Sequence, residues 1–347
     1  MPPEASLFDP SLQQPGEPGL PPELAGKWRP PLGTRRAWLR DLPARLMLRL
    51  SNHPRVRPGL GRRYQRARDA HAGQLPKLSP LGERIVDALE RDGVFVTTLG
   101  ELQLAGSHAA FTLARTLADR FAPDARRLVA GGKDFVFVPP ERIVAHPLIF
   151  DWGVQSELLD IVENYLGLPV AYDGVCINYT VADGRAVSTR KWHRDWEDRR
   201  MLKVAVYLND VDADGGPFEL IRHADPGQDD EHGFDYVLAD DAVLEQRLGE
   251  PFADQVVSCT GPAGTVVFAD TARFFHRGKP ATARDRAAVF YSYVARQPRH
   301  PFFCERSGMS RQDVATLARR LPDRQRAAAE WRRFLPLRMR LIPSARL

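Results

Sequence analysis

The feature that most constrains the fold is a run of short apolar segments that begins near residue 170. They comprise residues 174–181, 202–211, 217–221, 264–270 and 286–294. Val, Ile, Phe and Tyr are frequent in them, and turn-forming sequences such as the Asp-Gly-Gly-Pro of residues 214–217 separate them. Short strands that follow one another with tight turns predict a β-sandwich or barrel.

Two helical segments precede these strands. Residues 82–93 and 156–167 carry apolar side chains at helical spacing, and each segment ends at a glycine that is suited to stop a helix. Ser156 is the expected N-cap of the second helix, and residues 94–99 are expected to form a strand. The predicted fold class is therefore mainly β with flanking helices (α+β), in which the helices brace one sheet.

Extensions flank this central part on both sides. Residues 1–34 are rich in proline and lack apolar periodicity, which predicts a flexible lead-in. We expect residues 35–79 to form a basic N-terminal extension and residues 80–300 to form the main domain with its bracing helices. Residues 301–347 are expected to form a basic, helical C-terminal extension.

One stripe of apolar residues in the N-terminal extension has helical spacing. It consists of Trp38, Leu39, Leu42, Leu46 and Leu50. Pro43 is expected to interrupt this helix because proline lacks a backbone N–H group. Such a helix either packs against the main domain or binds an external surface, and we expect it to pack against the main domain.

Charge is distributed unevenly along the chain. Residues 1–80 contain 14 basic and 6 acidic residues, and residues 306–347 contain 11 and 3, whereas residues 81–305 contain 24 and 35. The basic ends either pack against the acidic body or bind an anionic partner. We expect packing, with a weak contact to an anionic membrane through the basic N-terminal region as the alternative. We do not expect nucleic acid as a partner, and the sequence leaves the oligomeric state open.

The cysteines and the hydropathy pattern bear on the cellular compartment. Cys176, Cys259 and Cys304 are odd in number and far apart, which predicts reduced thiols rather than a disulfide framework. No apolar run approaches the roughly 20 residues that a membrane-spanning helix needs. The proline-rich start has neither the basic beginning nor the apolar block of a signal peptide. We therefore expect a cytoplasmic protein.

The segment KWHRDWEDRR, residues 191–200, contains an H-R-D motif with two interpretations. In a protein kinase, an Asn follows five residues after the Asp, and a D-F-G motif comes later. Here Arg200 stands five residues after Asp195, the nearest similar triplet is a reversed G-F-D, and no G-x-G-x-x-G precedes the motif. These absences exclude the kinase interpretation.

The second interpretation is a metal site. On an extended strand, His193 and Asp195 point to the same face, and together they make two thirds of the 2-His-1-carboxylate triad that holds catalytic Fe(II). The third ligand must be another histidine, and the downstream candidates are His223, His232, His276 and His300. His276 is preferred because it follows the strong strand predicted for residues 264–270.

Ten residues after His276, Arg286 opens the last predicted strand. An arginine that faces into a barrel beside a metal is suited to a bidentate grip on a dicarboxylate. The stretches WHRDWEDRRMLKVAVYLNDVDADGGPFELI, GPAGTVVFADTARFFHRGKP and RAAVFYSYV resemble the phytanoyl-CoA dioxygenase family. The resemblance extends over roughly residues 80–300 and is specific over residues 190–295.

This resemblance implies a non-haem, Fe(II)- and 2-oxoglutarate-dependent oxygenase with a double-stranded β-helix (jelly-roll or cupin-like) core. It implies that His193, Asp195 and His276 bind iron and that Arg286 holds the distal carboxylate of 2-oxoglutarate. O2 would be the oxidant, and succinate and CO2 would be released as an unactivated C–H bond of a small molecule or an acyl or lipid-like substrate is hydroxylated. Further co-substrate contacts are expected among Asn178, Lys133 and Thr282.

Asp195 bears on the outcome of the reaction, because related halogenases replace this carboxylate with a small residue. Its presence favours hydroxylation or another oxidation over halogenation. Two alternatives remain from the sequence alone. One is a non-catalytic β-barrel binding protein that keeps the site residues, and the other is a protein whose basic ends attach it to membrane or nucleic acid.

Overall fold

The structure is a computed structural model that describes residues 32–345, except for residues 225–235 and 250. Most of the predicted lead-in, residues 1–31, lies outside the described residues, as does the candidate ligand His232. Within the described part of the chain, no helix is long and apolar enough to cross a membrane.

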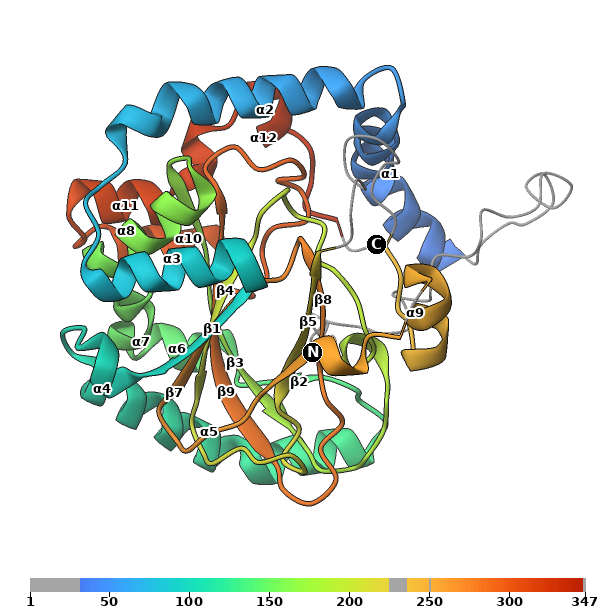
Figure 1. Ribbon diagram of the computed structural model, residues 1–347, viewed down its shortest axis with the longest axis vertical. Coiled ribbons are helices and arrows are strands. Elements are labelled where there is room, and N and C mark those ends of the chain that lie inside the picture. Colours follow the sequence, from blue (N-terminus) through green and yellow to red (C-terminus); the bar gives the residue numbers. More distant parts are fainter. Residues whose placement is uncertain (1–31, 225–235, 250, 346–347) are drawn as a thin grey trace, which may run out of the picture.

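Two antiparallel sheets form the centre of the molecule (Figure 1). The larger sheet has the strand order β1-β7-β4-β9-β3-β2, with β1 Val94–Thr98, β7 Thr265–Asp270, β4 Leu202–Tyr207, β9 Arg286–Ala295, β3 Val170–Thr180 and β2 Val136–Phe137. The smaller sheet has the order β6-β5-β8, with β6 Val256–Cys259, β5 Phe218–Ala224 and β8 Phe274–Gly278. The predicted antiparallel sheets with flanking helices are confirmed, although helices make up more of the described chain than the mainly β prediction implied.

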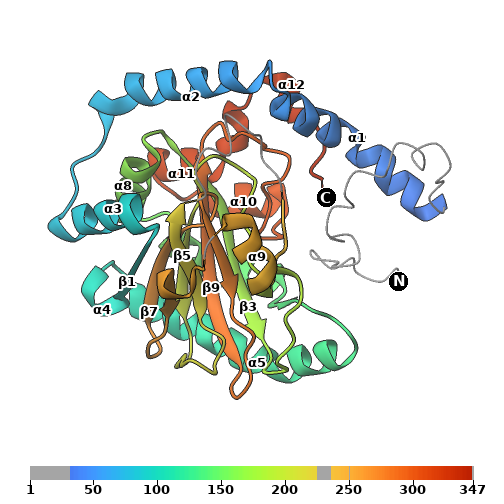
Figure 2. The ribbon, with the colours of Figure 1, turned by 45° about the vertical axis from the view of Figure 1, so that its right-hand side comes forward.

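The helices lie on several sides of these sheets. They are α1 Leu32–Asn52, α2 Arg57–His71, α3 Pro80–Asp92, α4 Leu99–Leu102, α5 Ser107–Ala130, α6 Pro140–Val144, α7 Pro147–Trp152, α8 Ser156–Leu166, α9 Asp241–Leu248, α10 Arg311–Ala318, α11 Asp323–Ala329 and α12 Leu337–Arg340. Short 3-10 helices are η2 Ala72–Gln74, η3 Ser188–Arg190, η5 Ala253–Gln255 and η6 Trp331–Phe334. Figure 2 shows α5 below the strands and α2 across the top of the molecule.

The alternation of side chains along each strand separates two cores. Val204 and Val206 of β4 belong to the large core between the six-stranded sheet and its helices. Ala205 and Tyr207 point the other way, into a core that the two sheets enclose together with Phe218. Side chains that point the same way as Ala205 and Tyr207 line the space between the two sheets, and the candidate site lies there.

The ends of the helices partly match the predictions from sequence. Ser79 caps α3 by accepting a hydrogen bond from the Gly82 N–H at 3.1 Å, and Gly93 ends this helix with a φ of 74°. Gly167 ends α8 with a φ of 67°, as expected. The prediction of Ser156 as N-cap is wrong, because it is the first helical residue and Gln155 precedes it without a side-chain cap.

Helix α1 also differs from its prediction. It continues through Pro43, which the sequence suggested would interrupt it. Pro43 is exposed, so solvent can satisfy the carbonyl group that loses its helical partner. The helix buries Ala44 and Ser51 against the body, while much of the predicted leucine stripe stays exposed. Docking therefore uses a different face of the helix from the one that the apolar stripe indicated.

The C-terminal extension packs against the acidic body, as the packing interpretation predicted. Leu317 of α10 and Ala328 of α11 belong to the large core. Arg320 pairs with Asp151 at 2.8 Å, and Arg324 pairs with two acidic residues of α8 at 2.5 and 2.8 Å. The residues after 300 are thus an integral part of the fold.

Candidate metal centre

A short antiparallel bridge brings two histidines together. The His193 N–H donates to the His276 carbonyl at 3.1 Å, and the His276 N–H donates to the His193 carbonyl at 3.0 Å. The segment with the H-R-D motif therefore lies beside β8 of the smaller sheet. The two imidazole rings have centroids 4.2 Å apart, and both side chains are buried.

Asp195 completes a cluster of three potential metal ligands. Its backbone N–H donates to the Thr271 carbonyl at 2.7 Å, which fixes the chain two residues after His193. Nitrogen or oxygen atoms of His193, Asp195 and His276 all lie within 4.8 Å of one another. The structure thus brings together the three residues that the sequence pointed to, from two segments about 80 positions apart.

Hydrogen bonds orient both imidazoles for metal binding. His193 Nδ1 lies 2.9 Å from the Lys191 carbonyl, and His276 Nδ1 lies 3.3 Å from the Phe274 carbonyl. A carbonyl can only accept, so each Nδ1 carries the proton and each Nε2 keeps its lone pair. Burial lowers the pKa of His193 to about 4 and that of His276 well below its usual value. Both rings are therefore neutral, as metal coordination requires.

Two half-buried cations flank the Asp195 carboxylate. Arg306 donates from Nη2 to Asp195 Oδ1 at 2.8 Å and from Nε to Glu197, while Lys203 Nζ lies 2.6 Å from Asp195 Oδ2. Burial alone would raise the pKa of Asp195, but the charges of Arg306 and Lys203 outweigh it and hold the pKa well below the usual range. Asp195 is therefore ionised, although it is only 1% exposed.

One oxygen of Asp195 remains available to a further ligand. No hydrogen bond of good geometry reaches Oδ2 within the described residues, although it lies beside Lys203. The same oxygen lies 3.8 Å from His276 Nε2. A buried carboxylate oxygen and two imidazole lone pairs that converge in this way fit a divalent metal with N and O ligands.

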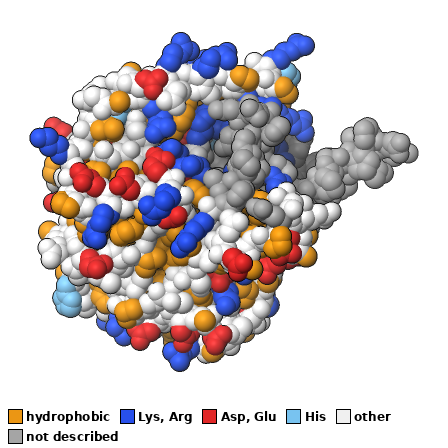
Figure 3. Space-filling model, in the orientation of Figure 1, with side chains coloured by type: hydrophobic (Ala, Val, Ile, Leu, Met, Phe, Trp, Pro, Cys, Tyr) orange, Lys and Arg blue, Asp and Glu red, His pale blue; other side chains and the backbone are white. Residues whose placement is uncertain are grey.

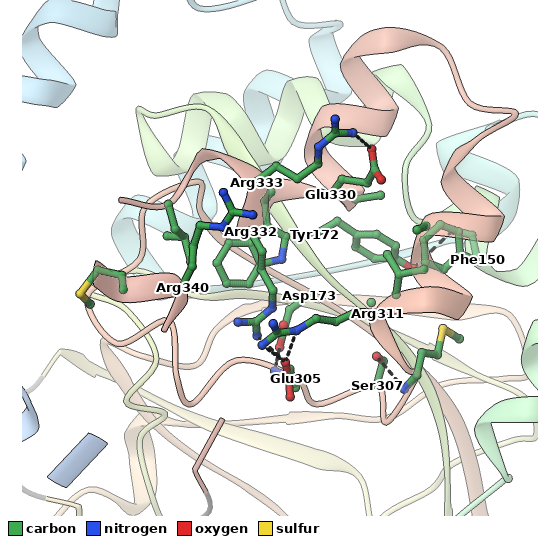
Figure 4. Close-up of a pocket in the computed structure, with 18 of the residues that line it drawn as sticks. Phe150, Tyr172, Asp173, Glu305, Ser307, Arg311, Glu330, Arg332, Arg333 and Arg340 are labelled. Carbon is green, nitrogen blue, oxygen red and sulfur yellow. Dashed lines mark hydrogen bonds and ion pairs between the residues drawn. The ribbon is translucent and has the colours of Figure 1, made fainter. Parts of the chain in front are cut away.

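The C-terminal segment positions Arg306. The buried Asp173 of β3 accepts hydrogen bonds from the backbone N–H groups of Glu305 and Arg306 at 3.0 and 3.2 Å. Burial raises the pKa of Asp173 to about 6. Arg311 and Arg332 converge on the Glu305 carboxylate at 3.3 and 3.2 Å, at the edge of a cavity of about 200 Å³ (Figure 4). The two backbone hydrogen bonds to Asp173 hold the loop from which Arg306 reaches the metal centre.

Arg286 lies inside the fold at the start of β9. Its guanidinium donates to the Gly216 carbonyl and, from Nη2, to Thr180 Oγ1 at 3.2 Å. Its Nε is buried and lacks a hydrogen-bond partner within the described residues. A Cβ built on Gly278 would lie 3.0 Å from Nη2, so the guanidinium lies against the strand that carries His276. Gly278 is two residues after His276 on β8, and two residues along a strand span about 7 Å. The Arg286 guanidinium therefore lies about this far along the strand from His276.

The other predicted co-substrate contacts have different positions. Asn178 is buried on β3, accepts a hydrogen bond from Thr180 Oγ1 at 3.0 Å and donates to the Val136 carbonyl. Lys133 is half-buried in the turn after α5. Thr282 is exposed and donates from its backbone to the Asp214 carbonyl. Among these residues, the structure links only Asn178 to Arg286, through Thr180.

Two of the alternative histidines can also be placed. His300 is buried, and its ring lies 3.0 Å from Ser51 Oγ and 2.6 Å from the Trp196 carbonyl, so it joins α1 to the body. His223 lies in β5, but its side chain is not among the described ones. His300 does not belong to the metal-ligand group found among the described residues.

Aromatic rings line one approach to the metal centre. Tyr236 lies 6.4 Å from His193 and 4.8 Å from Trp196, measured between ring centroids, and Trp196 stacks on Phe303 at 4.5 Å. On another side, Phe218 stacks on His276 at 5.5 Å. These rings form an apolar wall beside the candidate metal centre.

Two charged residues of the centre were not singled out from the sequence. Lys203 occupies an inward position of β4, where a lone lysine between apolar residues was a usable signal. Arg306 lies in a segment that the sequence indicated only as a basic extension. No sequence motif connects it to Asp195, which is 111 positions away. Only the folded structure shows that the C-terminal segment contacts Asp195.

Comparisons with known proteins add structural likenesses. No protein-family model matches the chain, and no curated protein matches it. Among solved structures, EctD from S. alaskensis with bound Fe is 21% identical with a TM-score of 0.43, over 65% of this chain and 80% of that chain. AviO1 from Streptomyces viridochromogenes Tue57 is 18% identical with a TM-score of 0.40, over 63% of this chain and 96% of that chain.

A third solved structure is HygX from Streptomyces hygroscopicus with nickel and 2-oxoglutarate bound. It is 14% identical with a TM-score of 0.39, over 63% of this chain and 88% of that chain. At these identities and TM-scores the likenesses assign neither a reaction nor a substrate to this chain.

Proposed function

We propose that this protein is an Fe(II)- and 2-oxoglutarate-dependent oxygenase of the phytanoyl-CoA dioxygenase type, on a double-stranded β-helix core. The observation that carries the proposal is the buried group of His193, Asp195 and His276, whose ligand atoms lie within 4.8 Å of one another. Two imidazoles and one carboxylate form the facial triad of non-haem Fe(II) oxygenases. Bound Fe(II) would supply the open coordination positions at which a co-substrate and O2 meet.

The protein's own residues would divide the remaining tasks. His193 and His276 keep their Nε2 lone pairs directed to the centre because each Nδ1 proton is held by a backbone carbonyl. Asp195 supplies the charged ligand, and Arg306 and Lys203 keep it ionised and in place. The aromatic wall formed by Trp196 and its neighbours would keep water from the reacting carbon.

Charge balance supports a dianionic co-substrate. Without metal, the carboxylates of Asp195 and Glu197 balance the cations of Arg306 and Lys203, since the two histidines are neutral. A divalent metal adds two positive charges in a buried place, and an anionic chelator offsets them. 2-Oxoglutarate carries two carboxylates, and we propose that Arg286 receives the distal one; its position against β8 supports this.

We assign the co-substrate pocket to Arg286, Thr180 and Asn178. Thr180 links the other two side chains by hydrogen bonds inside the fold. The proposal does not use Thr282, which is exposed, or Lys133, which lies in the turn after α5. Arg286 would grip one end of the dicarboxylate, and its spacing along β8 from His276 allows the other end to reach the metal.

The proposed reaction is hydroxylation of an unactivated C–H bond. One oxygen atom of O2 enters the product as a hydroxyl group and the other enters succinate, and 2-oxoglutarate loses CO2. The substrate class is a small molecule or an acyl or lipid-like compound. The presence of Asp195 as a third protein ligand favours this outcome over halogenation, since it leaves no ligand position for a halide.

We further propose that residues 80–300 form the oxygenase domain and that residues 301–347 complete it by supplying Arg306. The proposed compartment is the cytoplasm, and the support for it is that Cys176, Cys259 and Cys304 are all free.

The direct test of the proposal is formation of succinate from 2-oxoglutarate. The full chain, purified without oxygen and loaded with Fe(II), is given 2-oxoglutarate and O2 with a substrate library, and succinate is measured. We expect succinate above the metal-free background, including slow turnover without substrate. His193→Ala and His276→Ala should abolish it, whereas His108→Ala, at an exposed position of α5, should not. Absence of succinate under all conditions would instead favour a non-catalytic binding protein.

A further inference from the structure

Exposed apolar side chains are concentrated on one face of the molecule. Within the described part of the chain, ten large apolar side chains are exposed, and six of them lie on α1 or in residues 334–341. They are Leu39, Leu46 and Leu50 on α1, and Phe334, Leu337 and Leu341 near the C-terminus, with exposed fractions from 46% to 73%. Such a concentration indicates a surface that meets another apolar phase.

The elements that carry these side chains adjoin one another. Ala44 of α1 belongs to one small core with Phe302 and Ala345, and Met339 and Ile342 pack against it. Figure 1 shows α12 beneath α2, and Figure 2 shows it close to the junction of α1 and α2 at the top of the molecule. We call the surface formed by α1, α2 and residues 331–341 the basic face.

This face is strongly positive. Helix α1 contains five arginines and one aspartate. Helix α2 also contains five arginines and one aspartate, and it ends in a histidine. Residues 331–341 contain four arginines and no acidic residue. Figure 3 shows Lys and Arg side chains along the top edge, over α2. The arginines at 45, 49, 62, 63 and 338 are exposed, and no ion pair with an acidic side chain is found for them among the described residues.

The contrast with the rest of the C-terminal extension is informative. Arg320 and Arg324 also lie in a basic segment, but acidic residues of α7 and α8 neutralise both. Packing against the acidic body therefore accounts for these two arginines. Within the basic face, Arg332 and Arg333 are likewise paired, with Glu305 and Glu330. The five exposed arginines named above have no such ion pair among the described residues.

A groove opens between α2 and the body within this face. It encloses about 960 Å³, and the apolar side chains of Leu50, Leu60 and Phe334 are among those that line it. Five arginines also line it, Arg63, Arg199, Arg296, Arg299 and Arg338, and no acidic residue does among the described ones. Arg296 stacks on Phe334 at 4.8 Å, and its buried Nε has no hydrogen-bond partner within the described residues. The groove therefore has the chemistry of a site for an anionic group at an apolar boundary.

We propose that the basic face docks onto an anionic lipid bilayer. The exposed leucines of α1 and α12 enter the headgroup region, and the groove beneath α2 receives the anionic headgroup of one lipid. Basic residues attract an anionic leaflet, and exposed leucines add apolar burial, so the two features together favour a membrane over a purely polar polyanion such as nucleic acid. The inference does not depend on the proposed oxygenase activity.

The apolar part of the proposal is tested by co-sedimentation of the full chain with vesicles. The vesicles contain phosphatidylcholine alone or with about one third phosphatidylglycerol. We expect binding only to the anionic vesicles. The double variant Leu46→Glu, Leu337→Glu should weaken it at least about tenfold, because both leucines are more than half exposed and would meet the lipid. The control is Leu148→Glu, at a 49% exposed leucine of α7 that should not contact lipid.

The electrostatic part is tested in the same assay. The double variant Arg63→Glu, Arg338→Glu should weaken binding at least about tenfold, and rising salt should weaken the wild type. The double variant Arg120→Glu, Arg142→Glu, at exposed positions of α5 and α6, makes the same change in charge and should bind like the wild type. Circular dichroism spectra that match the wild type would show that the variants are folded.

Several outcomes would overturn the proposal. These are equal binding to phosphatidylcholine alone, no binding to the anionic vesicles, or equal losses in the test and control variants. Binding of glycerol phosphate or of duplex DNA by this face, without vesicle binding, would also overturn it, since the proposed partner is a bilayer. Succinate formation is a separate readout, so loss of docking and loss of the proposed activity remain distinguishable.

Discussion

Arg306 donates a hydrogen bond to Asp195 at 2.8 Å, although the two residues are 111 positions apart in the sequence. The same guanidinium also pairs with Glu197, and backbone contacts to Asp173 hold its loop. A segment that follows the last strand thus reaches back to a ligand of the candidate metal centre. This contact makes the C-terminal extension part of the site.

Arg306→Gln should destabilise the metal-free protein more than the metal-bound protein. The variant leaves two buried carboxylates with Lys203 as their remaining close cation, and breaking a buried pair of this kind costs about 3 kcal/mol. A bound divalent metal restores part of the lost positive charge, so added Mn(II) should stabilise the variant more than the wild type. The free energy of unfolding, measured by denaturant with and without Mn(II), checks this.

The control for that experiment is Arg311→Gln. Arg311 lies on the same segment and pairs with Glu305, but it is well exposed and does not reach Asp195. We expect little change in stability and the wild-type response to Mn(II). An Arg306→Gln variant that behaves like this control would refute the role of Arg306 at the metal centre.

Arg286→Gln should weaken binding of 2-oxoglutarate at least about tenfold and leave metal affinity nearly unchanged. The substitution removes a charge-assisted grip on the distal carboxylate but none of the metal ligands. Titration calorimetry of the Mn(II)-loaded chain with 2-oxoglutarate measures the effect. Arg284→Gln is the matched control, because Arg284 is exposed and pairs with Asp212 on the surface. Equal affinities for the two variants would count against the assigned pocket.

Gly93→Ala should cost more stability than Gly106→Ala. Both glycines have positive φ angles, 74° and 68°, so each substitution carries a backbone cost of about 1–2 kcal/mol. At Gly93 the new Cβ would also lie 2.4 Å from the buried ring of Phe274, whereas at Gly106 no atom lies within 4 Å. We expect a further 1–3 kcal/mol at Gly93, about the usual cost of overpacking. Equal unfolding free energies for the two variants would show that the contact with Phe274 is unimportant.

His300 should make the stability depend on pH below about 6.5. Burial lowers its pKa to about 3, so the folded protein keeps this ring neutral while the unfolded chain binds a proton. The free energy of unfolding then falls as the pH falls from about 6 to 4, by about 1 kcal/mol per pH unit from this one group. His300→Gln should reduce the number of protons taken up on unfolding by nearly one. Denaturant titrations at several pH values measure this number from the slope of the unfolding free energy against pH. An unchanged slope would contradict a neutral, buried His300.

The local parts of the site could be predicted from the sequence. His193 and Asp195 are two residues apart on an extended segment, and His276 follows a strand with a clear apolar pattern, so each placement depends on strand geometry alone. Gly93 and Gly167 ended their helices as expected because the requirement for a positive φ is also local.

The remaining parts depend on contacts between distant segments. Arg306 and Thr180 have no local pattern that points to Asp195 or Arg286, and only the folded chain brings them together. The path of α1 through Pro43 depends on exposure of that residue, which its sequence neighbours do not encode. The exposure of the α1 leucines likewise depends on which face of the helix packs against the body.

The central claim is that one Fe(II) binds at the His-Asp-His group and accepts 2-oxoglutarate as a chelating ligand. Anaerobic addition of 2-oxoglutarate to the Fe(II)-loaded chain, followed by visible absorption spectroscopy, tests this most directly, since such a chelate produces a metal-to-ligand charge-transfer band. We predict a band that saturates at one iron per chain, is lost in His193→Ala and His276→Ala, and is retained in His108→Ala. Absence of the band in the wild type, or a band of equal strength in His276→Ala, would contradict the account.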